Sequence, residues 1–290
     1  MTSSHYSAYR KNPIKNWEGL VEAENYFTNA KDTRWAFRGQ DNLEDLSTPL
    51  ERHCDSIHVK GADIAKLEVK MIRDFARLYH NYGGSAPPDK GNTLEWLSLM
   101  THYGAPTRLV NFTYSFFIAC YFALEPLNKK DKGAAVWAVN ITALEKDTNE
   151  YILNKGGKEW KHYHEFELKR DKEAFRELFM ASPRLQFVAP VNPLRLNERL
   201  TIQQGLFLAP GDVTATFIEN LSSFKYHADH FTKIIIDPDC WLPALGRLYR
   251  IGITTAALFP GVEGFAKSLR MKALILHDLP PQRVETLKEI

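Results

Sequence analysis

The stretch MTHYGAPTRLVNFTYSFF, from Met100 to Phe117, decides how the middle of the chain folds. The overlapping segment TLEWLSLMTHYG predicts a helix with Thr93 at its N-cap. Gly104 ends this helix, and Pro106 keeps it from resuming because proline lacks an amide proton. TRLVNFT then predicts a buried strand, and another helix is expected from about Ser115 to Leu124.

The rest of the chain mixes helical and strand patterns without regular alternation. Helices are expected for WEGLVEAENYF from Trp17, for residues 63–82 with Asp63 as cap, for residues 243–252 and for a polar excursion over residues 162–179. Strands are expected at 34–40 (RWAFRGQ), 134–140 (AAVWAVN), 184–190 (RLQFVAP), 199–211 (RLTIQQGLFLAPG), 231–238 (FTKIIIDP) and 273–279 (ALILHDL). This inventory predicts an α+β fold with mixed, largely antiparallel sheets and flanking helices, and it disfavours a doubly wound parallel sheet.

Composition places the chain among folded globular proteins. It has 290 residues, 44% hydrophobic and 25% charged, and no internal boundary is evident, so we treat residues 1–290 as one unit. The net charge of +2 is too small to indicate nucleic-acid binding through an overall field, although it is compatible with a local basic groove. The three cysteines, Cys54, Cys120 and Cys240, form no CxxC pair, which argues against a disulfide framework and a thiolate metal site.

The sequence also predicts a cytoplasmic protein without a membrane span. The first residues, MTSSHYSAYRKNPIKNW, contain no apolar core of a signal peptide. The uncharged run Leu109–Leu124 is shorter than the roughly 20 residues that cross a bilayer. The histidines of HYH (His162, His164) and HADH (His227, His230) have no second ligand set with diagnostic spacing, so no metal site is expected.

Polar side chains gather on the strand of the opening stretch. Period-two spacing places Thr107, Asn111 and Thr113 on one face and Arg108 on the other. Buried polar groups without partners cost roughly 1–3 kcal/mol each. A structural hydrogen-bond network and a bound ligand satisfy them equally well, and the sequence leaves both readings open.

Two other segments carry candidate binding groups. Arg38 ends an apolar strand before Gly39, where a guanidinium suits a phosphate or carboxylate and equally suits a salt bridge. His102 and Tyr103 occupy the last turn of the first helix. In TIQQGLF, Gln203 and Gln204 are expected on opposite faces of a strand, so one of them is free to face a shared pocket.

In order along the chain, FRGQ (37–40), EWLSLMTHYGAPTRLVNFTYSFFIACYFAL (95–124), GAAVWAVN, RLTIQQGLF and GITTAALFPGVEGFAKSLR resemble the FRG domain family. The resemblance extends from about Trp17 to about Lys272 and implies a single FRG-type domain in a bacterial toxin or antiphage setting. The family usually has an acid where this chain has Asn111. If that acid transfers a proton, the asparagine impairs this copy.

A more distant resemblance is to arginine-serine-glutamate ADP-ribosyltransferases. It implies NAD as substrate and a macromolecular acceptor, nucleic acid or protein, with the oligomeric state left open. Arg38 and Gly39 would hold the NAD phosphates, Tyr103 or Tyr114 would stack on nicotinamide, and Ser115 would belong to the hydroxyl strand that orders the pocket. The implied catalytic set is His102, Arg108, Asn111, Thr113, Gln203 and Gln204.

The family's glutamate is missing from this pattern. A neutral amide stabilises the positive ribose far less than a carboxylate does, so either Glu263 replaces it, or arginine and histidine act instead, or no such reaction occurs. Two alternatives to the enzyme therefore stay open: a non-catalytic module that binds a nucleotide or a partner, and a polar cluster that only ties the core together.

Overall fold

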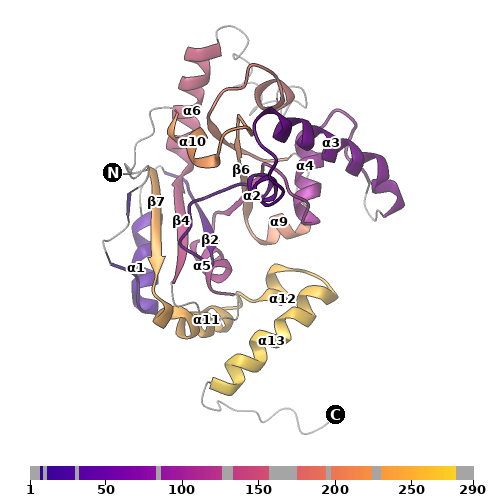
Figure 1. Cartoon of the computed structure of the whole chain (residues 1–290). Coiled ribbons are helices and arrows are strands. Elements are labelled where there is room, and N and C mark those ends of the chain that lie inside the picture. The colour runs from indigo at the N-terminus through magenta and orange to yellow at the C-terminus, as the bar shows by residue number, and fades with distance from the viewer. Residues whose placement is uncertain are drawn as a thin grey trace.

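A computed structural model of the chain describes most of its residues, namely 7–8, 12–29, 33–82, 86–125, 133–156, 175–193, 197–223 and 230–278. These residues form one seven-stranded sheet with helices on both sides (Figure 1). The strands are β1 (Ser7–Ala8), β2 (Trp35–Gln40), β3 (Val110–Thr113), β4 (Ala134–Asn140), β5 (Val188–Val191), β6 (Gly205–Pro210) and β7 (Phe231–Ile236).

The helices fall before, between and after the strands. They are α1 (Trp17–Thr28), α2 (Pro49–Ser56), α3 (Ala62–Leu78), α4 (Thr93–His102), α5 (Phe116–Leu124), α6 (Ile141–Gly156), α9 (Glu198–Ile202), α10 (Phe217–Ser222), α11 (Trp241–Arg250), α12 (Thr255–Leu258) and α13 (Val262–Asp278). Short 3-10 helices cover Tyr79–Asn81 and Pro238–Cys240, and a π-helix covers Arg176–Met180.

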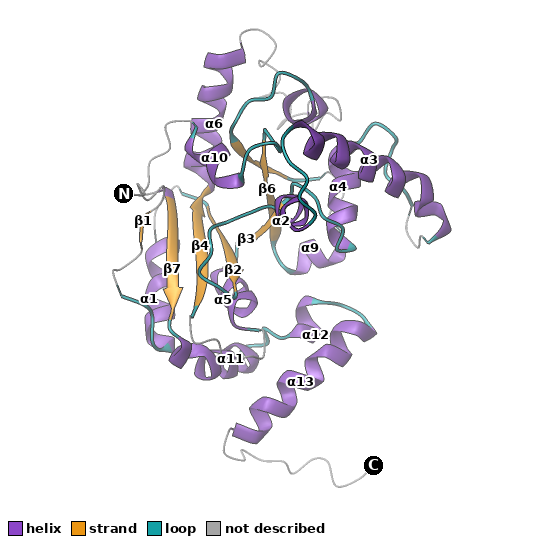
Figure 2. Ribbon diagram, in the orientation of Figure 1, coloured by secondary structure: helices purple, strands orange, loops and turns teal. Residues whose placement is uncertain are grey.

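The sheet has the order β1-β7-β4-β2-β3-β6-β5. All neighbours are antiparallel except β1 and β7, which confirms the predicted α+β class and its largely antiparallel sheet. β2 pairs with β4 along six residues, whereas it pairs with β3 at one position, Phe37 with Thr113. The sheet therefore opens between β2 and β3 into two halves that meet at a single pair (Figure 2).

Side chains from alternate positions build a core on each face of the sheet. On β4, which is buried throughout, Val136 and Ala138 pack with α1, α5 and α11, while Trp137 and Val139 pack with α4, α6 and α10. Helix α5, with the sequence FFIACYFAL, is apolar all round, as expected of a helix buried between a sheet and other helices. Ser115 caps it by accepting a hydrogen bond from the Ile118 amide.

Most of the expected elements are confirmed, including the strands at β2, β3, β4 and β7 and the helices at α1, α3, α4, α5 and α11. Two expected strands are wrong. RLTIQ begins as helix α9, because Asn197 caps it through the Leu200 amide, and β6 starts at Gly205. ALILHDL continues α13, so residues 273–278 are helical.

The two predicted helix caps are also wrong. Asn92 caps α4 and Thr93 is its first residue, and α3 starts after Gly61, with Asp63 in its first turn. The polar excursion expected over 162–179 lies largely outside the described residues.

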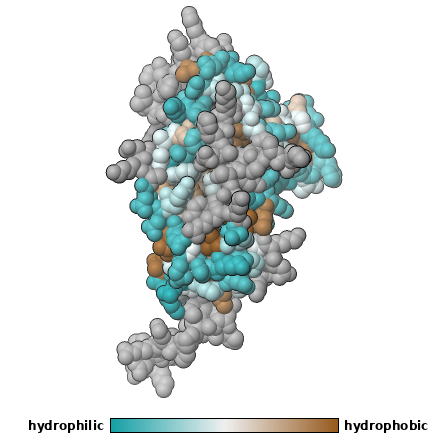
Figure 3. Space-filling model, turned by 90° about the vertical axis from the view of Figure 1, so that its left-hand side faces the viewer, coloured by the Kyte–Doolittle hydropathy of each residue, from teal (hydrophilic) through white to brown (hydrophobic). Residues whose placement is uncertain are grey.

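Three further sequence expectations concern the surface and the cysteines. Within the described part of the chain, no helix has the length and apolarity that crossing a membrane requires. Where it is described, the surface on the side of β1 and β7 is mostly hydrophilic, with hydrophobic residues in small separate patches (Figure 3). All three cysteines are free and buried.

Candidate functional site

The opening between β2 and β3 forms a cleft of about 250 Å³. Each strand contributes three consecutive residues to it, 37–39 from β2 and 111–113 from β3, and Phe122, Arg199 and Gln203 complete the lining. Five of the residues that the sequence singles out thus meet in one place: Arg38, Gly39, Asn111, Thr113 and Gln203.

Arg38 is the central group of this cleft. Its Nη1 donates to the carbonyl oxygen of Asn111 at 2.9 Å and so bridges the two halves of the sheet. Its Nε is buried and has no hydrogen-bond partner among the described residues. Burial, and then the nearby charge of Arg52, lower the pKa of Arg38 to about 10, so the guanidinium stays protonated at neutral pH. A half-buried guanidinium whose buried Nε has no partner among the described residues is arranged to receive an anion.

Arg199 supplies a second cation, and sequence reasoning missed it because α9 was taken for a strand. Its guanidinium lies 4.2 Å from the centroid of the Phe259 ring, which holds it in place. Burial lowers the pKa of Arg199, and the carboxylates of Glu125 and Glu263 oppose that shift. None of the described residues that line the cleft is acidic. The two guanidinium groups therefore make the cleft cationic.

Gly39 is a packing residue. A Cβ atom at this position would lie 1.9 Å from the Ala119 carbonyl oxygen and 2.5 Å from the Ala123 nitrogen, both in the backbone of α5. Only glycine lets α5 approach β2 this closely. Gly39 was expected to hold the NAD phosphates, whereas here its missing side chain makes room for a helix.

The hydroxyl and amide groups beside the cleft hold its walls together. Thr113 Oγ1 donates to the Gln203 carbonyl oxygen at 2.6 Å and accepts from the Ser115 amide at 3.0 Å. Gln203 Nε2 donates to the Leu258 carbonyl oxygen at 2.9 Å. This network joins β3, the α9–β6 turn and α12. The hydroxyl of Thr113 therefore belongs to a structural hydrogen-bond network. Gln203 belongs to the same network, and both residues line the cleft.

Gln203 and Gln204 lie in the turn before β6, which corrects their assignment to a strand. Gln204 adopts a left-handed backbone conformation, with φ 49°, and its side chain is exposed and does not line the cleft. One of the two glutamines was expected to face the pocket, and Gln203 is the one that lines the cleft.

Arg108 lies elsewhere, in a buried ion pair. Its guanidinium donates through Nε to Glu68 Oε1 at 2.8 Å and through Nη2 to Glu68 Oε2. Its Nη1 donates to the carbonyl oxygens of Phe179 and Pro210, at 2.7 and 3.3 Å. Both side chains of the pair are 1% exposed. Arg108 thus ties α3 to β6 and the π-helix. Thr107, on the same connection, bonds the hydroxyl of Thr101 at 2.6 Å.

The remaining predicted residues do not line the cleft. His102 ends α4, its Nδ1 is buried without a partner among the described residues, and burial together with the charge of Arg199 lowers its pKa. Tyr103 is 57% exposed and lines a different, apolar groove. Tyr114 is 37% exposed, and Ser115 caps α5. The aromatic rings that do line the cleft are Phe37, Phe112 and Phe122, all missed by sequence reasoning.

Metal and acid candidates are placed as follows. Within the described residues, no group of three or more His, Cys, Asp or Glu side chains could hold a metal ion. His230 Nδ1 lies 3.7 Å from Asp147 Oδ2, whereas His162, His164 and His227 fall outside the described residues. Glu263 is exposed in the first turn of α13 and bonds Lys267 at 2.6 Å, which lowers its pKa.

Comparison with known proteins identifies the part of the chain that contains most of the cleft. Residues 33–132, about a third of the chain, match the family model of the FRG domain. This range includes Arg38, Asn111 and Thr113, while Arg199 and Gln203 lie beyond it. Searches of curated proteins and of solved structures gave no significant match. The chain therefore contains an FRG domain, at residues 33–132.

Proposed function

We propose that the cleft between β2 and β3 binds the pyrophosphate of an NAD-like nucleotide, and that the protein transfers ADP-ribose from NAD to a macromolecule. The supporting observation is the pair of guanidinium groups, Arg38 and Arg199, in a cleft that no described acidic residue lines. Arginine forks match phosphate oxygens, and the buried Arg38 Nε has a hydrogen bond left to donate. The family resemblance supplies the setting, a bacterial toxin or antiphage protein.

The size of the cleft fits the phosphate end of such a ligand. About 250 Å³ is below the roughly 300–1,000 Å³ of pockets that enclose whole cofactors, so the remainder of the nucleotide would extend out of the cleft. Phe122 is half-buried and is the most accessible ring of the lining, which suits it to stack on the nicotinamide. Asn111 is exposed at the mouth, within reach of ribose hydroxyls.

The transfer step breaks the bond between ribose C1′ and nicotinamide and forms a bond from C1′ to an acceptor nucleophile, which loses its proton. Positive charge grows on the ribose meanwhile, and a carboxylate is the group that stabilises it best. Glu125 and Glu263 both act electrostatically on Arg199, which makes them the nearest candidates. Glu125 is half-buried at the end of α5, whereas Glu263 is exposed and already paired with Lys267. We therefore place Glu125 ahead of Glu263 for this role.

A second function, nucleotide binding without turnover, is favoured by one specific observation. The described lining of the cleft contains two cations and no carboxylate, and Asn111 stands where the family usually has an acid. Such a site holds an anion firmly while offering little to a developing positive charge.

Calorimetric titration with ADP-ribose and NAD, at about 50 mM salt to limit screening, tests the binding step. Arg38→Gln and Arg199→Gln should each lose a charge-assisted interaction of about 1.5–3 kcal/mol, a loss of roughly tenfold to more than a hundredfold in affinity. Arg247→Gln, on the exposed last turn of α11, is the matched control and should bind like the unmodified protein.

Labelled NAD incubated with the protein and cell extract then separates the two functions. Label transfer that requires Arg38 and Glu125 supports the transferase. Binding with neither transfer nor NAD loss supports the binding module. The absence of any binding by the folded protein contradicts both.

A further inference from the structure

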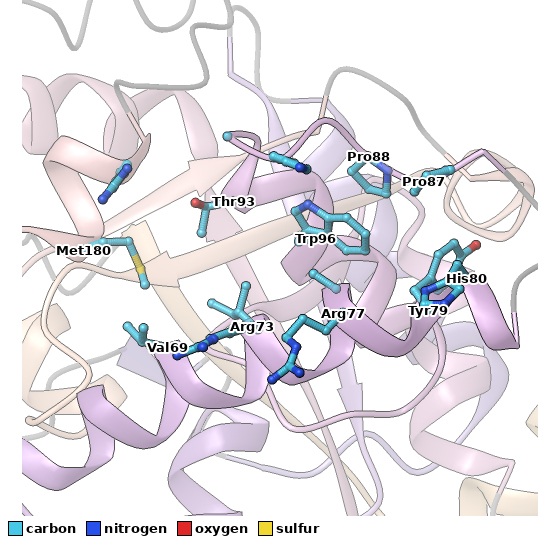
Figure 4. Close-up of a pocket in the computed structure, with 15 residues that line it drawn as sticks. Val69, Arg73, Arg77, Tyr79, His80, Pro87, Pro88, Thr93, Trp96 and Met180 are labelled. Carbon is cyan, nitrogen blue, oxygen red and sulfur yellow. The ribbon is translucent and has the colours of Figure 1, made fainter.

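A second concave site lies between α3 and α4. It is a groove of about 670 Å³, bounded by α3, by the loop of residues 86–92, by the start of α4 and by the π-helix Arg176–Met180 (Figure 4). No residue lines both this groove and the cleft between β2 and β3. Nothing in the proposed NAD reaction uses it.

The groove is strongly basic. Arg73 and Arg77 reach it from α3, His80 from the 3-10 helix that follows, Lys90 from the loop and Arg176 from the π-helix, and all five are exposed. None of its described lining residues is acidic. This local concentration contrasts with the chain as a whole, where 37 basic residues are balanced by 35 acidic ones. Flanking acids at Asp89 and Glu177 reduce the potential around the groove without lining it.

The cations on α3 form a row. Spacings of three and four residues place Lys66, Lys70, Arg73 and Arg77 on one face of the helix, roughly 6 Å apart along its axis for each four-residue step. Lys66 and Lys70 are exposed and extend the row beyond the groove. Two acids of the same helix face elsewhere: Glu68 pairs with Arg108, and Asp74 lines the neighbouring apolar groove. The third, Asp63, pairs with Lys66 at the start of the row, outside the groove. A chain of anions could therefore follow α3 from Lys70 to Arg77 without meeting a carboxylate of this helix in the row.

The floor of the groove is apolar. Ile72, Trp96, Met180 and Pro88 form it, and Figure 4 shows Trp96 between the proline loop and α3. Trp96 is only 5% exposed, and its indole donates to the Asp89 carbonyl oxygen at 3.1 Å, so the ring is fixed. An apolar floor beneath a cationic rim suits a ligand that has both flat apolar faces and phosphates.

We infer that this groove binds single-stranded nucleic acid, with phosphates on the arginine row and a base over the apolar floor. Single strands are held by positively charged grooves that also contact the faces of the bases. Duplexes are instead read by elements that project into their grooves, and here the surface is concave. An acidic peptide would engage the cations and leave the apolar floor unused.

Fluorescence anisotropy with labelled oligouridine and oligothymidine of about 12 nucleotides, in the absence of NAD, tests this inference apart from the nucleotide proposal. Single-strand binding loses affinity with salt by about 0.7 log units per log unit for each neutralised phosphate. Arg73→Gln/Arg77→Gln should therefore lower the salt slope by about 1.4, and Lys90→Gln/Arg176→Gln, from the opposite walls, should lower it by about the same amount.

Arg270→Gln/Lys272→Gln on the exposed part of α13 removes the same charge away from the groove and should change neither affinity nor slope. Binding of either oligonucleotide that both groove variants weaken supports the inference. It is overturned if neither oligonucleotide binds at about 50 mM salt, if the groove variants behave like the α13 control, or if polyglutamate of equal charge displaces the strand as well as unlabelled strand does.

Discussion

Two arginines of the FRG domain, Arg108 and Arg38, differ in how completely their guanidinium groups are hydrogen-bonded. Arg108 has every side of its guanidinium occupied, by the carboxylate of Glu68 and by two backbone carbonyl oxygens. Arg38 has one carbonyl oxygen, a buried Nε without a partner in the described structure and a neighbouring cation, Arg52. A satisfied buried cation holds elements together, whereas an unsatisfied one marks a place for a ligand. The predictions below test this contrast.

The largest effect should come from breaking the satisfied pair. Glu68→Gln leaves the Arg108 charge buried without a counter-charge, so the free energy of unfolding should fall by about 3–5 kcal/mol, measured by denaturant titration. Asp63→Asn is the matched control on the same helix, because its ion pair with Lys66 is exposed, and it should cost no more than about 0.5 kcal/mol. Equal effects of the two substitutions would show that the buried pair is not a structural tie.

Gly39 tests the one packing residue inside the cleft. Gly39→Ala places a Cβ against the backbone of α5 and should destabilise the protein by about 1–3 kcal/mol, or by more if α5 cannot shift. Thermal unfolding measures this. Gly91→Ala is the comparison, because its Cβ would meet no atom within 4 Å. A stable Gly39→Ala protein with weakened nucleotide binding would mean instead that the glycine serves a ligand.

Arg38 should behave in the opposite way to Arg108. Its lowered pKa means that folding disfavours its charged form, so removing the charge relieves a cost at every pH below about 10. Arg38→Met should therefore change the free energy of unfolding by no more than about 1 kcal/mol while weakening ADP-ribose binding at least tenfold. Arg108→Met leaves the Glu68 carboxylate buried without a counter-charge. It should therefore lower the free energy of unfolding about as much as Glu68→Gln does.

The smallest effect concerns pH. The pKa of His102 is lowered from its ordinary value of 6.5 by burial and then by the charge of Arg199, so the unfolded chain takes up this proton more readily. This contribution to stability is fully present above pH 6.5 and is lost as the pH falls below that value. His102→Gln should flatten the fall in stability below pH 6.5. An unchanged pH profile would exclude a buried neutral His102.

Periodicity and turn residues predicted the strands β2, β3, β4 and β7 and the helices α1, α3, α4, α5 and α11, because local chemistry sets these elements. The helices α2, α6, α10 and α12 were not predicted. Ser115 and Gly104 set the ends of their helices, and the apolar runs of β4 and β7 form neighbouring strands of the sheet. The errors at α9 and α13 have one cause: short apolar runs fit helix and strand equally well, and the Asn197 cap outweighed the apparent strand pattern of RLTIQ.

The site was predictable in part. Arg38, Asn111 and Thr113 meet because β2 and β3 are neighbours, and Gln203 joins them through the turn before β6. Sequence reasoning treated Arg108 as an equivalent candidate, because the partner that satisfies it, Glu68, is brought in by α3 from forty residues away. Phe122 was missed because its approach to the cleft depends on tertiary packing, and Arg199 was missed because α9 was taken for a strand.

A structure of the protein soaked with NAD tests the central claim most directly. The pyrophosphate should lie between Arg38 and Arg199, with an oxygen accepting from the Nε of Arg38 and the Arg108–Glu68 pair unchanged. NAD bound in the α3–α4 groove or elsewhere, with the cleft between β2 and β3 empty, would contradict the assignment of this cleft as the nucleotide site.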